Sequence, residues 1–118
     1  MKIIIADDSE LIHERLTAMI SELPECEIVG QARDGGAAIE LIKDRKPDVV
    51  VLDIRMPKSN GIDVLKNIQK YNSIPRVIIF TNYPYPQYKT RCTALGADYF
   101  LDKATEFQKL RDLLKQLV

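Results

Sequence analysis

Short apolar runs alternate with longer amphipathic stretches along the whole 118-residue chain. The apolar runs cover residues 2–6, 27–32, 48–52, 76–80 and 98–101. The first, third and fourth runs are nearly continuous and rich in Val and Ile, which is typical of parallel strands covered on both faces. The second run is weaker and the fifth is shorter. The pattern therefore predicts five strands.

Between these runs, apolar residues recur at the spacing of one helix face. The predicted faces are Ile12, Leu16, Met19 and Ile20; Ala38, Leu41 and Ile42; Val64, Leu65 and Ile68; and Phe107, Leu110, Leu114 and Leu117. Thr105 and Gln108 have the spacing of a capping box at the start of the last helix. A fourth helix is expected over residues 87–95, because Pro84 and Pro86 oppose an earlier regular turn and Gly96 provides a stop.

The predicted order is a strand followed by a helix, repeated five times. Right-handed crossovers turn this order into an open parallel sheet with helices on both sides, the doubly wound α/β class. No repeat, low-complexity segment or linker interrupts residues 1–118, so a single domain is expected. In such sheets the functional crevice lies outside the carboxyl ends of the strands, and chemically active residues are expected there.

The composition argues against several classes of function. Hydrophobic residues make up 46% of the chain and charged residues 29%, and 17 basic residues balance 17 acidic ones. Zero net charge argues against nucleic acid as a direct partner of this domain, because backbone binding leaves a basic footprint. No run approaches the length of a membrane span, and the N-terminal run is too short for a signal peptide. Cys26 and Cys92, far apart in sequence, are interpreted as reduced thiols of a cytoplasmic protein.

Polar residues whose side chains can react or bind ligands follow the predicted strands. They are Asp7 and Asp8 after the first run, Asp53 after the third, Thr81 after the fourth and Lys103 after the fifth. Taken singly, such residues are ordinary turn, cap or surface residues. If the first and third strands are neighbours, however, three carboxylates converge, and they would repel one another without a cation.

A magnesium ion would resolve this repulsion, since Mg²⁺ is bound by a few carboxylates together with water and substrate phosphate. A lysine and a threonine opposite the carboxylates are suitable donors for phosphoryl oxygens. The predicted chemistry is nucleophilic attack by Asp53 on phosphorus, which yields an acyl phosphate. Positioning and charge neutralisation supply most of the acceleration in such transfers.

The same residues resemble the receiver domain of bacterial response regulators in two-component signalling. The resemblance rests on Asp7–Asp8, the DIRMP stretch from Asp53 with Gly61, Thr81, and the ALGADYFLDK stretch that ends at Lys103. These motifs occur in the family's order and cover the chain from end to end. The resemblance implies a flavodoxin-like fold with strand order 2-1-3-4-5, similar to a single-domain chemotaxis regulator.

The resemblance also implies a role for each site residue. Asp53 would be the phosphorylated aspartate. Asp8 would bind Mg²⁺ directly, Asp7 would bind it directly or through water, and Asp53 and the backbone carbonyl of Arg55 would be further ligands. Lys103 would contact the phosphoryl group and the acidic cluster.

The family's switch would involve Thr81, which shifts toward the phosphoryl oxygens, and Phe100, which turns inward with it. The output surface would be the fourth helix, fifth strand and fifth helix. The implied partners are a histidine kinase or phosphotransfer protein and a downstream protein target. We also expect phosphorylation to promote homodimerisation through the output surface. The domain would be a signalling switch and not an enzyme in the usual sense.

The sequence departs from the family pattern near the fourth strand. Asn82 stands where Ala, Ser or Gly is common, and the YPYP stretch from Tyr83 is an unusual start for the fourth helix. Tyr83, Tyr85 and Tyr88 would form either a partner-binding patch or a layer packed over that helix. Arg55 and Tyr83 lie at positions that commonly tune phosphoryl lifetime in this family.

Other interpretations fit the residues less well. An aspartate-nucleophile phosphatase of the haloacid-dehalogenase type needs a second aspartate two residues after the nucleophile, where this chain has Arg55. A flavodoxin-like cofactor binder would place flavin phosphate beside acidic groups, and a receiver-like module that works without phosphorylation would not need the intact acceptor site. His13 is interpreted as a surface residue of the first helix, and the Asp34-Gly35-Gly36 stretch as a helix start.

Overall fold

The computed structural model describes residues 1–118 and contains the ten expected elements in the expected order. They are β1 (Lys2–Ala6), α1 (Glu10–Ser21), β2 (Glu27–Ala32), α2 (Gly35–Arg45), β3 (Val49–Leu52), α3 (Gly61–Ile68), β4 (Arg76–Thr81), α4 (Pro86–Ala94), β5 (Tyr99–Asp102) and α5 (Phe107–Leu117). All strand pairs are parallel, and the order in the sheet is β2-β1-β3-β4-β5. The flavodoxin-like fold with strand order 2-1-3-4-5 is thus confirmed.

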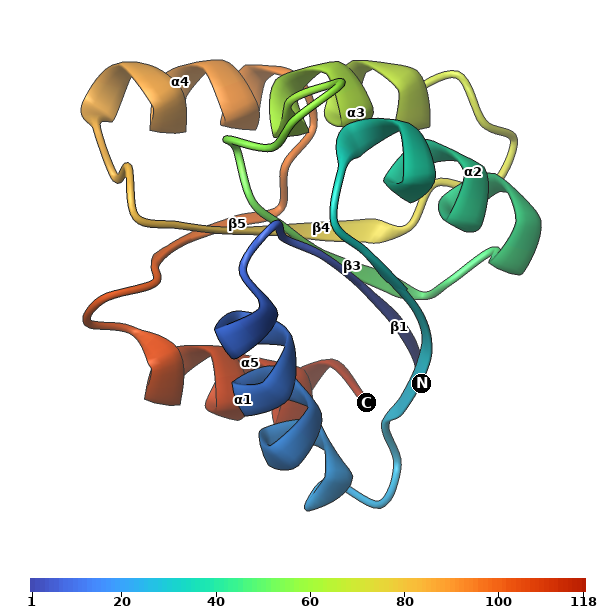
Figure 1. Cartoon of the computed structure of the whole chain (residues 1–118), viewed down its shortest axis with the longest axis vertical. Coiled ribbons are helices and arrows are strands. Elements are labelled where there is room, and N and C mark those ends of the chain that lie inside the picture. The colour runs from blue at the N-terminus through green and yellow to red at the C-terminus, as the bar shows by residue number, and fades with distance from the viewer.

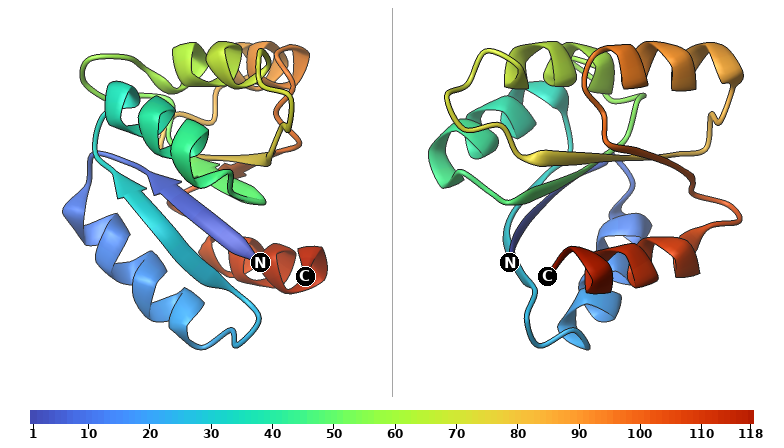
Figure 2. Two further views of the ribbon diagram at one scale, coloured as in Figure 1. Left: turned by 90° about the vertical axis from the view of Figure 1, so that its right-hand side faces the viewer. Right: turned by 180° about the vertical axis from the view of Figure 1, so that it is seen from behind.

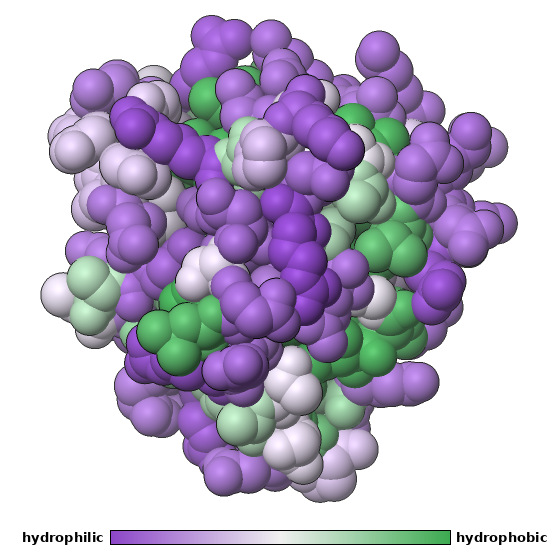
Figure 3. All heavy atoms as spheres, in the orientation of Figure 1, coloured by the Kyte–Doolittle hydropathy of each residue, from purple (hydrophilic) through white to green (hydrophobic).

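The sheet separates two layers of helices. Helices α1 and α5 cover one face, and α2, α3 and α4 cover the other (Figure 1). The side views show the same three-layer arrangement (Figure 2). None of the helices is both long and apolar enough to cross a membrane. The surface seen in Figure 3 is mainly hydrophilic, with apolar atoms showing in small patches.

The central strands are continuously apolar because both of their faces are buried. In β1, Ile3 and Ile5 pack in the core under α1 and α5, whereas Ile4 and Ala6 pack in the core under α2, α3 and α4. Strands β3 and β4 alternate in the same way. The period of two along each strand therefore gives one core on each side of the sheet.

Two local predictions need correction. The capping box at the start of α5 is wrong, because the helix begins at Phe107 and its N-cap residue is Glu106 without a side-chain cap. The Glu106 carboxylate instead accepts a hydrogen bond from the backbone N–H of Asp102, at 2.9 Å. Helix α4 begins at Pro86, one residue earlier than predicted, since proline is well tolerated in the first turn.

Asp34 caps α2, as the sequence indicated for the Asp34-Gly35-Gly36 stretch. Its side chain accepts a hydrogen bond from the backbone N–H of Ala37 at 2.8 Å. This stretch is therefore a helix start and not a phosphate-cradling loop.

Candidate functional site

The strand order brings the predicted site residues to one edge of the sheet. Asp7 and Asp8 directly follow β1, Asp53 follows β3, Thr81 ends β4, and Lys103 follows β5. These four strands are consecutive neighbours in the sheet, so their carboxyl ends lie side by side. The crevice predicted from sequence therefore contains every one of these residues.

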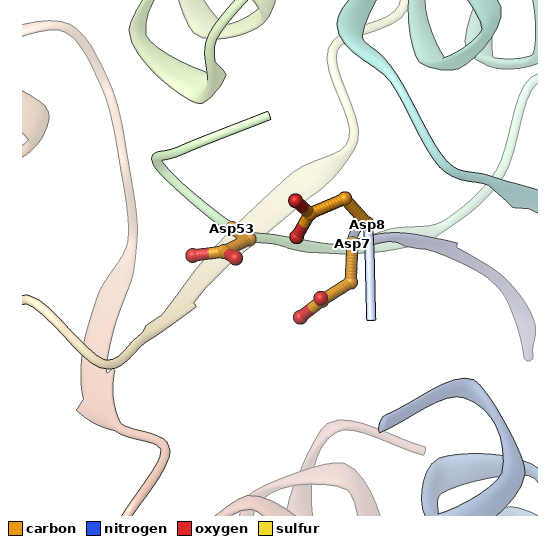
Figure 4. A group of neighbouring side chains, drawn as sticks. All are labelled: Asp7, Asp8 and Asp53. Atoms are coloured by element: carbon orange, nitrogen blue, oxygen red, sulfur yellow. The ribbon is translucent and has the colours of Figure 1, made fainter. Parts of the chain in front are cut away.

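Three carboxylates converge in this crevice. Oxygen atoms of Asp7, Asp8 and Asp53 lie within 4.8 Å of one another, and the side chains gather at the ends of β1 and β3 (Figure 4). Asp7 and Asp53 are only 3% and 5% exposed, whereas Asp8 is exposed to solvent. Two carboxylates of the cluster are thus buried, and the third, that of Asp8, is in contact with solvent.

Lys103 is the buried counter-charge of this cluster. Its ammonium nitrogen Nζ lies 2.6 Å from Oδ2 of Asp7 and 3.1 Å from Oδ2 of Asp53. The residue is 6% exposed, so water screens these ion pairs very little. The lysine therefore joins the two buried carboxylates and fixes their separation.

The pKa values of the site reflect this environment. Burial raises the pKa of Asp53, the nearby charge of Lys103 lowers it, and Asp7 raises it again, so that the net direction is upward. Burial disfavours the charged form of Lys103, but its bonds to Asp7 and Asp53 outweigh that effect and raise its pKa. The lysine is thus held as a cation, while the ionised form of Asp53 is destabilised in the absence of a further positive charge.

The donor set fits a divalent metal ion. Three ionised carboxylates and one ammonium leave two uncompensated negative charges in the crevice, which one Mg²⁺ would neutralise. All available side-chain donors are oxygen atoms, the ligand type that Mg²⁺ prefers.

Backbone hydrogen bonds hold the acidic residues in place. The N–H of Asp53 donates to the carbonyl of Ala6 at 2.9 Å, which joins the ends of β3 and β1. The Oδ1 atom of Asp53 accepts from the N–H of Ile54 at 2.8 Å. Gly61 lies against this turn, and a Cβ atom there would come within 2.1 Å of the Asp53 carbonyl oxygen. Only glycine permits this close approach at the start of α3.

Thr81 and Phe100, the predicted switch residues, lie on the neighbouring strands β4 and β5. Thr81 is fully buried, and its Oγ1 accepts a hydrogen bond from the N–H of Tyr83 at 3.1 Å. The Thr81 carbonyl accepts from the N–H of Lys103 at 2.8 Å, which ties the lysine to β4. Phe100 is half-buried and packs against the core under α2, α3 and α4.

The family model for the response regulator receiver domain matches residues 3–115. The chain belongs to this family. A protein-glutamate methylesterase/protein-glutamine glutaminase 2 from Vibrio vulnificus (strain YJ016) is 43% identical over 81 residues, which are 69% of this chain and 24% of that protein. The chain spans 22–36% of the length of the methylesterase/glutaminase relatives that it matches.

Solved receiver structures agree with the assignment. The response regulator domain of Thermotoga maritima CheB is 30% identical, with a TM-score of 0.88 over 99% of this chain and 92% of that one. A chain of the CheX-CheY-BeF3-Mg+2 complex from Borrelia burgdorferi is 30% identical, with a TM-score of 0.83 over 97% and 89%. A receiver domain is a signalling module, and the acidic cluster found here is consistent with a phosphoacceptor site.

In this receiver domain, Arg55 and three tyrosines form a stack between the β3–α3 and β4–α4 loops. The guanidinium carbon of Arg55 lies 4.0 Å from the ring centroid of Tyr83. The centroids of Tyr83 and Tyr85 are 6.3 Å apart, and those of Tyr85 and Tyr88 are 5.8 Å apart. Tyr88 packs partly into the core, while Tyr85 is 47% exposed. Packing is thus confirmed for Tyr88, whereas a partner-binding patch that includes the exposed Tyr85 stays a prediction.

His13 lies next to the acidic cluster, where sequence reasoning did not place it. The prediction of a surface histidine is wrong, because His13 is 1% exposed and its Nε2 contacts the carbonyl oxygen of Asp7 at 2.7 Å. The signal was present in the spacing, since position 13 shares a helix face with Leu16 and Ile20. Because histidine is polar, the sequence indicated a place at the surface and not on the buried face of α1.

Proposed function

We propose that this receiver domain, spanning residues 1–118, accepts a phosphoryl group on Asp53 in a magnesium-dependent reaction. The observation that carries the proposal is the ion-paired triad, in which buried Lys103 bridges Asp7 and Asp53 beside solvent-exposed Asp8. A purely structural ion pair would not need three converging carboxylates with a net negative charge. A phosphoryl-transfer site needs this combination of nucleophile, cation-binding oxygens and fixed positive charge.

In the proposed reaction, a carboxylate oxygen of Asp53 attacks the phosphorus of a phosphohistidine on a histidine kinase or phosphotransfer protein. The new P–O bond forms as the P–N bond breaks, and the leaving imidazole nitrogen takes up a proton from solvent. The Lys103 ammonium, already 3.1 Å from Asp53, would move its contact to a phosphoryl oxygen and stabilise the transferred charge.

Mg²⁺ would be held by Asp7, Asp8, Asp53 and the backbone carbonyl of Arg55, where it would supply positive charge next to the phosphoryl oxygens. The cation would also favour ionised Asp53, the nucleophilic form, against the upward shift of its pKa by burial. The similarity to a receiver solved in a complex described with BeF3 and Mg supports this assignment.

Phosphorylation would be transmitted to the output surface by a rearrangement between two states. Thr81 would break its bond from the N–H of Tyr83 and donate its hydroxyl to a phosphoryl oxygen, and Phe100 would turn inward from its half-buried place. The phosphoryl group would favour this state because it makes contacts there that the unphosphorylated state lacks. The changed surface would be α4, β5 and α5, which would bind a downstream protein target or a second copy of the domain in the cytoplasm.

Intact-mass measurement after incubation with acetyl phosphate and magnesium tests the proposal. We expect a gain of one phosphoryl group, and no gain for Asp53→Asn or for a chelator-treated sample. Magnesium-dependent labelling of Asp53→Asn at another residue would contradict the assignment of the acceptor. No labelling of the unmodified protein, with a known receiver labelled in parallel, would favour an interaction module that works without phosphorylation.

A further inference from the structure

The buried His13 ring connects helix α1 to the first residue of the acidic site. Its Nε2 lies 2.7 Å from the carbonyl oxygen of Asp7 and 3.2 Å from the carbonyl oxygen of Ala32. Carbonyl oxygens only accept hydrogen bonds, so the ring must carry a proton on Nε2 and donate it. The contact therefore joins α1 to the carboxyl ends of both β1 and β2.

These bonds belong to a closed set around Asp7. The N–H of Asp7 donates to the same Ala32 carbonyl at 3.0 Å, so His13 and Ala32 hold the Asp7 residue at both its N–H and its C=O. The N–H of Ser9 donates to Oδ1 of Asp7 at 2.9 Å. The backbone of Asp7 is thus held by Ala32 and His13, and its side chain by the backbone N–H of Ser9.

The Asp7 carbonyl lies in the peptide plane that leads into Asp8. A ring that fixes this carbonyl therefore also sets the direction in which the exposed Asp8 side chain leaves the backbone. No hydrogen bond or ion pair holds the Asp8 side chain itself. The orientation of this peptide is thus what aims the Asp8 carboxylate at the cluster.

Burial of His13 lowers the free energy of unfolding in a way that burial of an apolar residue would not. Its other ring nitrogen, Nδ1, is buried without a hydrogen-bond partner. Burying an unpaired polar atom destabilises the folded state, and it calls for a reason at the position where it occurs. Neighbouring positions on the same face of α1, such as Leu16 and Ile20, are filled by apolar side chains.

We propose that His13 is a positioning residue for the metal site, which acts by donating its Nε2 proton to the Asp7 carbonyl and so orienting Asp7 and Asp8. The proposal rests on the proposed function, because it assumes that these aspartates bind Mg²⁺. Residues that orient metal ligands from outside the ligand set commonly change metal affinity by about 10- to 100-fold when removed.

Magnesium titrations of two variants separate positioning from packing. Gln reaches about as far as Nε2 and retains an N–H donor, whereas Leu fills similar space without one. Following backbone amide resonances of the folded protein, we expect His13→Leu to weaken Mg²⁺ binding by about tenfold. His13→Gln should restore affinity to within about threefold of the unmodified protein, because its amide replaces the donor. Thermal unfolding of both variants reports packing separately.

The outcomes are distinguishable. Equal Mg²⁺ affinity in all three folded proteins would overturn the positioning role, while leaving the proposed phosphoryl transfer intact. Absence of Mg²⁺ binding by the unmodified protein would overturn the proposed function and this inference with it. If His13→Leu does not fold, ¹⁵N spectra of the His13 ring in the unmodified protein test the proposal. A proton on Nδ1 instead of Nε2 would overturn it. An Nε2–H resonance whose chemical shift does not change during the magnesium titration would also overturn it.

Discussion

Lys103 contacts Asp53 and Arg55 follows it by two residues in the sequence, yet the surroundings of these two cationic side chains are opposite. Lys103 is 6% exposed and makes two short ion pairs to buried carboxylates. Arg55 is exposed, and its guanidinium lies against the ring of Tyr83 without an ion pair to the aspartates. The same formal charge therefore has different consequences, since burial removes the water and salt that weaken electrostatic interactions.

The difference separates two functions of positive charge in the site. Lys103 is part of the folded core of the site, and its partners would be left as unpaired buried charges without it. Arg55 is exposed and stacks on the ring of Tyr83, which itself lies against Tyr85. The buried cation is therefore paired with the acidic cluster, whereas the exposed cation is paired with an aromatic ring.

The largest expected effect comes from removing the buried cation. Lys103→Met should lower the free energy of unfolding by about 3 kcal/mol in metal-free buffer, because Asp7 and Asp53 lose their counter-charge. Urea unfolding followed by circular dichroism measures this change. Arg55→Met is the matched control, because it removes the same charge from a residue only two positions after Asp53. Equal destabilisation by the two substitutions would contradict the distinction between buried and exposed cations.

A smaller effect of opposite sign is expected for the acceptor. Burial raises the pKa of Asp53, so its ionisation lowers the free energy of unfolding at any pH above that raised value. Asp53→Asn should therefore stabilise the metal-free protein at neutral pH by about 1 kcal/mol. The gain should shrink as the pH falls from the raised pKa of folded Asp53 to the pKa of the unfolded-state carboxyl, and it should vanish below that, where Asp53 is protonated in both states.

Magnesium provides the control for that prediction. The cation should stabilise the unmodified protein by mass action and reduce the advantage of Asp53→Asn. Thermal unfolding of both proteins over a pH series, with magnesium or with chelator, measures these differences. An Asn variant that is less stable than the unmodified protein in chelator would show that Lys103 outweighs burial at this carboxylate.

The smallest effect is expected at the exposed stack. Arg55→Ala and Tyr83→Ala should each change the Tm by less than about 3 °C, as is usual for surface substitutions. Any coupling between them in a double-mutant cycle should disappear at about 1 M salt, because exposed charges are screened. The effect of Lys103→Met should persist there. A salt-insensitive coupling would show that the Arg55–Tyr83 contact is shielded from solvent.

Much of this molecule follows from the sequence alone. Continuous apolar runs such as residues 49–52 predict strands buried on both faces, because helices must cover both sides of a parallel sheet. Asp53 and Lys103 were identified because the carboxyl ends of parallel strands share one edge, whatever the details of packing. These features depend on local periodicity and chain direction, which the order of residues determines directly.

Tertiary structure decided the features that depend on contacts between distant residues. His13 is buried because the ends of β1 and β2 offer it two carbonyl acceptors, although a histidine on a helix is usually a surface residue. The N-cap residue of α5 is Glu106, whose carboxylate accepts from the backbone N–H of Asp102 in the preceding strand, a contact that the capping-box spacing could not show. Arg55 meets Tyr83 only where two loops approach. Local sequence determines periodicity and residue chemistry, whereas burial and partner choice require the whole fold, because they arise between segments far apart in the chain.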